Sequence, residues 1–198
     1  MSLKAPYLTE PERYLDGHSC NKSGREYDSQ RQKLYDAQKW APEGQRFQAV
    51  SDMQCYVDDM IGRPWWKRRF SLSQVRVKDG RGRRRAGARS YITSGNGQVS
   101  LLANPQVKMP RHARYERCLI HEVVHCLVLP PHAAHGRLYA KAYLELVRWR
   151  MGGDAYEKLL KGYREENVKY HPHRTAKVEK DALKRNGSAA ARRTAILV

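Results

Sequence analysis

Apolar residues recur at the spacing of an α-helix in five segments of the chain. The second segment has the clearest start, because Ser51 and Gln54 fit a capping box in which each satisfies the other's backbone donor. The first has only Leu34 and Tyr35 as a thin apolar face, with Asp28 as its predicted cap. The predicted helices cover residues 28–40, 51–61, 110–129, about 136–151 and about 154–163.

Alternating apolar and polar residues predict three short strands between the second and third of these helices. The run 75–78 is closed by the turn pair Asp79-Gly80, and the runs 90–93 and 98–102 flank the turn sequence 95–97, Gly-Asn-Gly. The simplest arrangement is a small antiparallel sheet of about three strands packed against the helices. The sequence therefore predicts an α+β fold.

Neither end of the chain shows a regular apolar period. Residues 1–26 are rich in proline, glycine and charge, and the periodicity fades beyond about residue 170. We therefore expect a loosely ordered arm over 1–26, one domain over 27–170, and a basic, flexible tail over 171–198.

The formal charge of +18 indicates a surface that attracts polyanions such as nucleic acid, acidic proteins or anionic membranes. Eleven lysines and arginines face a single acid in the segment 63–89, which also holds Trp65 and Trp66. This segment is a candidate nucleic-acid surface, with cations on phosphates and indoles stacked on bases. The alternative is a solvated basic loop over 81–89 beside two core tryptophans, and for the tryptophans we favour the core.

Cysteine usage and the lack of long apolar runs bear on the compartment. No run approaches the roughly 20 apolar residues that span a bilayer, so we expect no membrane association. Cys118 and Cys126 fall on one predicted helix, roughly 12 Å apart along its axis, which is too far for a disulfide. With Cys20 and Cys55 they form no Cys-x-x-Cys pair. Free thiols suit a reducing compartment, so we expect a cytoplasmic protein.

The chemistry-bearing motif is His121-Glu122-Val123-Val124-His125, inside the apolar helix predicted over 110–129. Histidines four residues apart project from one face of a helix and can reach a single metal ion. Glu122 is turned about 100° around the axis, where it suits a general base that activates a zinc-bound water rather than a ligand. The alternative is a pair of surface histidines, which the apolar residues on every side disfavour.

A catalytic zinc site needs a third protein ligand and an open fourth position. The candidates are His132, His135 and Glu145. The metzincin pattern is excluded, because Val128 and Pro131 occupy the positions of its glycine and its third histidine. We favour His135, because the double proline 130–131 reverses the chain and brings His135 back toward the helix.

The motif followed by 135–139, His-Gly-Arg-Leu-Tyr, resembles the SprT-like and WLM-type minimal zinc peptidases, in which the second motif supplies the third ligand. A nearer resemblance is to a small actinobacterial family of metallohydrolases, also seen in mycobacteriophages, whose activity is inferred from the motif. Its matching segments lie within about 27–168 and include 28–31, 56–58, 65–70 and 75–77. The resemblance implies a zincin-like fold with His135 as third ligand, and in a phage the host cytoplasm as location.

We therefore expect a zinc-dependent hydrolase that acts on a protein or peptide, with Zn²⁺ on His121, His125 and His135 and with Glu122 as catalytic residue. Hydrolase chemistry follows from the residues, whereas the peptide substrate follows mainly from the resemblance. The alternative is a nucleic-acid-associated protein with a structural zinc site and no catalysis. Tyr139 or Tyr143 could donate to an oxyanion, although packing is the simpler role for both.

Overall fold

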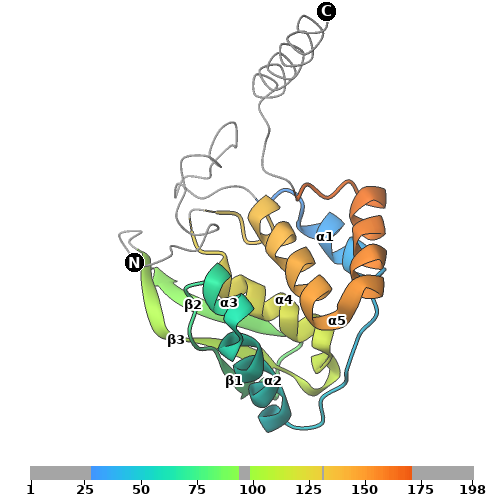
Figure 1. Ribbon diagram of the computed structural model, residues 1–198. Coiled ribbons are helices and arrows are strands. Elements are labelled where there is room, and N and C mark those ends of the chain that lie inside the picture. The colour runs from blue at the N-terminus through green and yellow to red at the C-terminus, as the bar shows by residue number, and fades with distance from the viewer. Residues whose placement is uncertain (1–27, 94–98, 131, 171–198) are drawn as a thin grey trace, which may run out of the picture.

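The computed structural model describes residues 28–93, 99–130 and 132–170 of the chain. The expected N-terminal arm and basic tail, and the turn at 95–97, lie outside these residues, as does Cys20. Within them, no helix is both long enough and apolar enough to cross a lipid bilayer. The fold is α+β, with helices packed around a small sheet (Figure 1).

The three described strands are β1 (Arg76–Asp79), β2 (Gly87–Thr93) and β3 (Val99–Met109), in the order β1-β3-β2. The expectation of three strands is confirmed, but the sheet is mixed rather than antiparallel, since β1 pairs with β3 in parallel. The prediction ended the third strand at residue 102, before Asn104 and Pro105, which interrupt the alternation. The strand continues to Met109, and its last residues pair with β2 on one side and β1 on the other.

Five helices are described, of which α2 and α4 contact the sheet most: α1 (Arg31–Gln38), α2 (Val50–Gly62), α3 (Pro64–Arg69), α4 (Glu116–Leu127) and α5 (Arg137–Glu165). The third predicted helix began too early, because the residues after Pro110 form a short 3₁₀ turn, Arg111–Ala113, before α4 starts. Two predicted helices, about 136–151 and 154–163, are merged in α5, which is broken at Gly152. Gly152 has φ +89, a conformation that other residues adopt only with strain.

The predicted capping box of α2 is wrong, and the reason is a tertiary contact. The side chain of Asp52, not that of Gln54, accepts a hydrogen bond from the backbone N–H of Ala49 at the start of the helix. Gln54 instead donates to the carbonyl of Val75 and accepts from the N–H of Val77. The glutamine therefore ties α2 to the beginning of the sheet.

The core forms where α4 contacts β2 and β3 on one side and α5 on the other, while α1 packs against α5 (Figure 1). Apolar residues of α4 that the sequence assigned to several faces, such as Leu119 and Val123, are fully buried. The core position expected for Trp66 is confirmed, with no exposed surface, and Trp65 is partly buried and stacks on Trp149 with ring centroids 4.5 Å apart. The sandwiched position of α4 holds its polar motif in a largely apolar environment.

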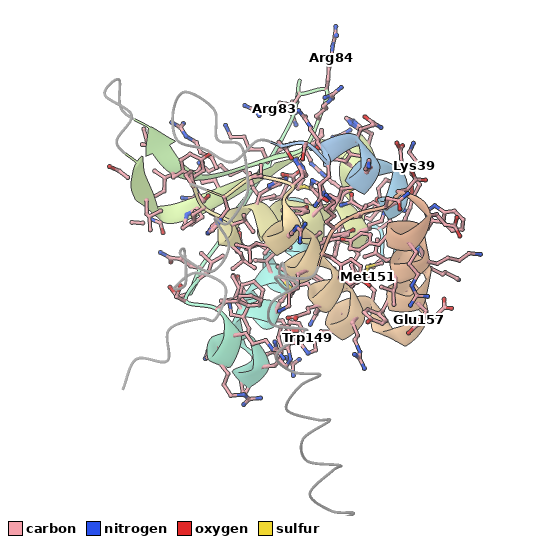
Figure 2. The ribbon with its side chains drawn as sticks, turned by 90° about the horizontal axis from the view of Figure 1, so that it is seen from above. Lys39, Arg83, Arg84, Trp149, Met151 and Glu157 are labelled. Carbon is pink, nitrogen blue, oxygen red and sulfur yellow. The ribbon has the colours of Figure 1, made fainter. Side chains whose placement is uncertain are left out.

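The loop between β1 and β2 carries the basic residues 81–85 to the surface. Arg83 and Arg84 project from it, as seen from above in Figure 2. Its residues 84–86 line a cavity together with residues of α1, so two segments far apart in sequence face each other here.

Candidate metal centre

Two histidines of α4 form the first part of a metal-binding cluster. His121 and His125 lie four residues apart on the helix, and their Nε2 atoms are 3.1 Å apart. Two nitrogens bound tetrahedrally to zinc at 2.0–2.1 Å would lie roughly 3.3 Å apart. The spacing that the sequence predicted is therefore present, and it suits a shared ion.

His135 joins them from the residues that precede α5. The ligand atoms of the three histidines all lie within 4.8 Å of one another. The Nε2 atom of His135 is buried and has no hydrogen-bond partner in the described part of the chain. A buried nitrogen without a partner is costly unless something else satisfies it, and a metal ion in the centre of the cluster would do so. The three residues thus fit a bound metal ion.

Side chains at the start of the described chain orient two of these rings. Asp28 accepts a hydrogen bond from Nδ1 of His135 at 2.8 Å, and the amide of Gln38 lies against Nδ1 of His121, with Nε2 at 2.8 Å and Oε1 at 3.0 Å. A proton on Nδ1 leaves the lone pair on Nε2 free for a metal, and such outer partners are typical of histidine metal sites. The expected helix cap at Asp28 is therefore wrong, because α1 has no side-chain cap and Asp28 binds His135 instead.

Sequence reasoning missed the roles of both Asp28 and Gln38. Neither belongs to a motif with metal-ligand spacing, and each is more than 80 residues away in sequence from the histidine that it contacts. The only pointer was that 28–31 is one of the segments that carry the family resemblance.

Burial keeps the rings of α4 in the uncharged form that binds metal. It holds the pKa of His121 well below its usual range, and it lowers the pKa of His125 to about 3, with the neighbouring His135 adding to the effect. Burial also pushes the pKa of Asp28 upward, but the hydrogen bonds from His135 outweigh it and hold that pKa below the usual value. The cluster is therefore two neutral imidazoles and a third that is bonded to a carboxylate.

The other two candidates for the third ligand lie elsewhere. The carboxylate of Glu145 is 3.2 Å from the guanidinium of Arg69, in an ion pair outside the cluster. His132 lines a cavity near His135, but it is not part of the three-residue group.

The tyrosines of α5 have structural roles. Tyr139 is fully buried, and its hydroxyl donates to the backbone carbonyl of His121 at 3.0 Å. Tyr143 is also fully buried, and its hydroxyl lies 3.4 Å from the carbonyl of Arg117. Both hydroxyls are directed at the backbone of α4, so these contacts support a packing role for the two tyrosines.

Glu122 lies between two cavities that open onto the cluster. The larger, here the first cavity, has a volume of about 860 Å³ and reaches His121. The second cavity has a volume of about 430 Å³ and reaches His125 and His135. Glu122 lines both and is only 8% exposed. Burial raises its pKa to about 7, although the backbone N–H of Ala88 on β2 donates to its carboxylate; a cation bound nearby would lower this pKa.

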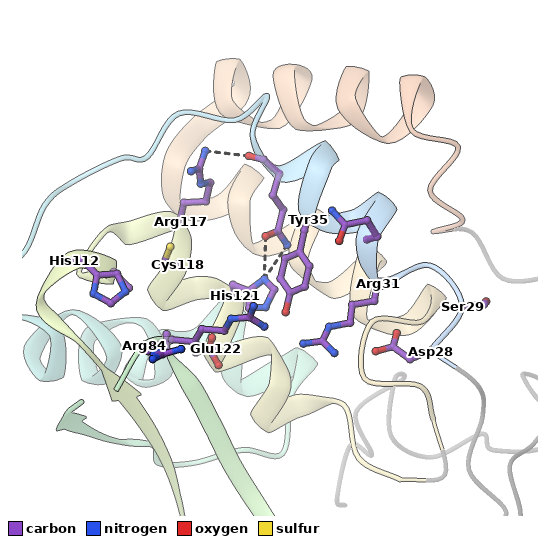
Figure 3. A pocket seen from close by; sticks show the side chains of 15 residues that line it. Asp28, Ser29, Arg31, Tyr35, Arg84, His112, Arg117, Cys118, His121 and Glu122 are labelled. Carbon is purple, nitrogen blue, oxygen red and sulfur yellow. Dashed lines mark hydrogen bonds between the residues drawn. The ribbon is translucent and has the colours of Figure 1, made fainter. Parts of the chain in front are cut away.

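The partly buried ring of Tyr35 forms the wall of the cluster on the side of α1. It stacks on His121 with centroids 5.5 Å apart and lies 5.1 Å from the ring of His135. Figure 3 shows Tyr35 beside His121, with Arg31 next to it and Glu122 below. The ring restricts solvent access from this side, while the cavities leave access along β2 and the 84–86 loop.

The described cysteines take no part in the cluster. Cys55, Cys118 and Cys126 are free thiols, as expected, and burial raises the pKa of Cys126 to about 12, which makes it unreactive.

No family model, curated protein or solved structure matches this chain.

Proposed function

We propose that this protein is a zinc-dependent hydrolase, most specifically a metallopeptidase. The observation that carries the proposal is the convergence of three histidines, two buried and one partly buried, beside two cavities, with the carboxyl group of Glu122 lining both cavities. Three histidines and an open side are the ligand pattern of catalytic zinc sites. Imidazole also binds copper, iron and nickel, so the choice of zinc is a more specific claim than the presence of a metal site.

Each residue has a role in the proposed reaction. His121, His125 and His135 would hold the ion, which when bound lowers the pKa of water and polarises a carbonyl group. Glu122 accepts a proton from the attacking water and delivers it to the leaving amine. Asp28 and Gln38 hold two of the imidazole rings in the tautomer that leaves Nε2 free, and Tyr35 shields the cluster from bulk water.

A peptide substrate is favoured by the strand that borders the second cavity. Among the described strands, β2 pairs with β3 only, and residues 87–91 of β2 line the cavity, where the backbone N–H of Ala88 is bonded to Glu122. An extended peptide can pair with the edge of a sheet through its backbone, independently of its sequence. This would place a peptide bond beside Glu122, in agreement with the resemblance to minimal zinc peptidases.

The same geometry argues against a purely structural zinc site. Structural zinc is held by four protein ligands, whereas the cluster in the described residues offers three ligand atoms. Two cavities also reach the cluster, which a closed structural site does not need.

The test is hydrolysis of an unfolded protein such as casein by the zinc-loaded chain and by its Glu122→Gln variant. We expect the variant to keep one equivalent of zinc and to lose activity by at least about 100-fold. Glu145→Gln is the matched control, because Glu145 is on the adjoining helix but pairs with Arg69. It should keep both zinc and activity. Full activity in Glu122→Gln would overturn the mechanism.

A further inference from the structure

Four exposed arginines line the two cavities that meet at Glu122, and a fifth, Arg117, is partly buried and lies 4.0 Å from Glu43. Arg31, Arg84 and Arg85 line the first cavity, and Arg31 and Arg89 line the second. They come from α1, from the loop before β2 and from β2 itself, and all four are exposed. In the view of Figure 3, Arg31 and Arg84 lie on opposite sides of Glu122. We refer to these four residues as the arginine rim.

The positive charge of the arginine rim is not neutralised within the described part of the chain. None of the four forms an ion pair there, and the guanidinium carbon of Arg31 lies 5.6 Å from the centroid of the Tyr35 ring. The carboxyl groups that line the cavities are those of Asp28 and Glu122. Asp28 is bonded to His135 and is close enough to Arg31 for that charge to help lower its pKa, but the two form no ion pair, and Glu122 accepts from Ala88.

Other arginines of the basic segment are arranged differently. Arg63 pairs with Asp59, with a closest distance of 2.6 Å, and Arg69 pairs with Glu145. Part of the uncompensated charge of the segment, that of Arg84, Arg85 and Arg89, therefore lies at the cleft that leads to the metal cluster. A cleft that is lined by charges of one sign raises the local concentration of ligands that carry the opposite charge.

We propose that the arginine rim selects substrates with acidic side chains, so that the protein cleaves peptides next to glutamate or aspartate. This rests on the proposed peptidase function and names its substrate class. A peptide paired with the edge of β2 would carry its side chains alternately toward and away from the cavities. Carboxylates on such a peptide come within reach of guanidinium groups on both sides of the reacting bond, and arginine binds carboxylates through paired hydrogen bonds.

An acidic peptide fits this cleft better than a nucleic acid does. Non-specific single-strand binding combines cations with exposed aromatic rings on which bases stack. Trp66 has no exposed surface, and Trp65 is covered by Trp149 on one face and lies 4.9 Å from the guanidinium carbon of Arg69. The tryptophans of the basic segment are therefore not a stacking platform.

The first experiment measures binding, with zinc-loaded Glu122→Gln protein and fluorescently labelled peptides of equal length. We expect a glutamate-rich peptide to bind at least about tenfold more tightly than a glutamine-rich one, with a preference that falls as salt increases. A single-stranded oligonucleotide of similar charge is the competing probe. Equal binding of the two peptides would overturn the proposal, as would tighter binding of the oligonucleotide through the same arginines.

The second experiment removes two rim charges in the protein with Glu122 intact, as Arg84→Gln/Arg85→Gln. The matched control is Lys67→Gln/Arg68→Gln on α3, which removes the same charge at exposed positions that do not line either cavity. We expect kcat/KM on the glutamate-rich peptide to fall about three- to tenfold in the rim variant only, with the glutamine-rich peptide unaffected. Equal losses in both variants would overturn the proposal, because they would reflect net charge.

The two experiments separate this inference from the peptidase proposal. Hydrolysis without acidic preference would leave the peptidase standing and remove the substrate class. Selective binding of the acidic peptide without any hydrolysis would remove the peptidase and leave an acidic-peptide site.

Discussion

Helices α4 and α1 both contribute to the metal centre, but they do so in different ways. α4 supplies two of the three histidines that could hold a metal ion, together with Glu122, within five consecutive residues. α1 supplies no ligand: it carries Gln38 against His121 and the ring of Tyr35 against the cluster, and Asp28 lies just before it. The first contribution is a property of one helix, whereas the second exists only once α1 has packed in its place.

The packing of α1 explains why this difference matters. α1 has eight residues, and a helix of that length is unstable on its own in water. It is held against α5 by Leu34 and Ala37, which have no exposed surface. Changes in α1 should therefore weaken metal binding, although α1 itself supplies none of the three histidines.

The largest expected effect is the loss of metal when a ligand is removed. His135→Ala leaves two ligands on α4 and should reduce zinc from one equivalent to well below it, measured by metal analysis after dialysis. His132→Ala is the control, because His132 lies outside the three-histidine group and should retain one equivalent. Full zinc in His135→Ala, with loss in His132→Ala, would assign the third ligand to His132.

The next effect tests the anchoring of α1. Leu34→Ala should lower the free energy of unfolding by about 2–5 kcal/mol in urea titrations, because it leaves a cavity at a fully buried position. It should also weaken zinc binding, since Asp28 and Gln38 would lose their alignment. Lys33→Ala, at an exposed position of the same helix, should change neither quantity by much. Unchanged zinc affinity in Leu34→Ala would mean that α4 and His135 bind zinc without help from the packing of α1.

A smaller effect is expected from the carboxylate behind His135. Asp28→Ala should weaken zinc binding about 10–100-fold, measured by competition with a chromogenic chelator, because the imidazole ring loses the group that fixes its tautomer and orientation. Asp36→Ala removes an exposed carboxylate from α1 that pairs with Lys39, and it should leave zinc affinity unchanged. Equal affinities in the two variants would limit Asp28 to a structural role.

Local features were predicted well from the sequence, and long-range ones were not. The position of His121 and His125 on one helix face follows from a period of four residues, and the helix itself follows from its apolar neighbours. The prediction of His135 depended on the proline turn and the resemblance, and the structure places it in the cluster.

Contacts between distant segments had no local signal. The contacts of Asp28 and Gln54 replace the helix caps that the sequence predicted, because each side chain found a tertiary partner. The parallel pairing of β1 with β3 was missed for the same reason, since it joins runs that are about 30 residues apart. Patterns over a few residues indicate where helices and strands form, but they do not indicate which helices and strands pack against each other.

The most direct test of the metal centre is the coordination of zinc in the loaded protein, measured by X-ray absorption spectroscopy or in a zinc-bound crystal. The account predicts one ion bound by the Nε2 atoms of His121, His125 and His135 at about 2.0–2.1 Å, with a non-protein oxygen in the fourth position. A fourth protein ligand that closes the site, or an ion that omits His135, would contradict it.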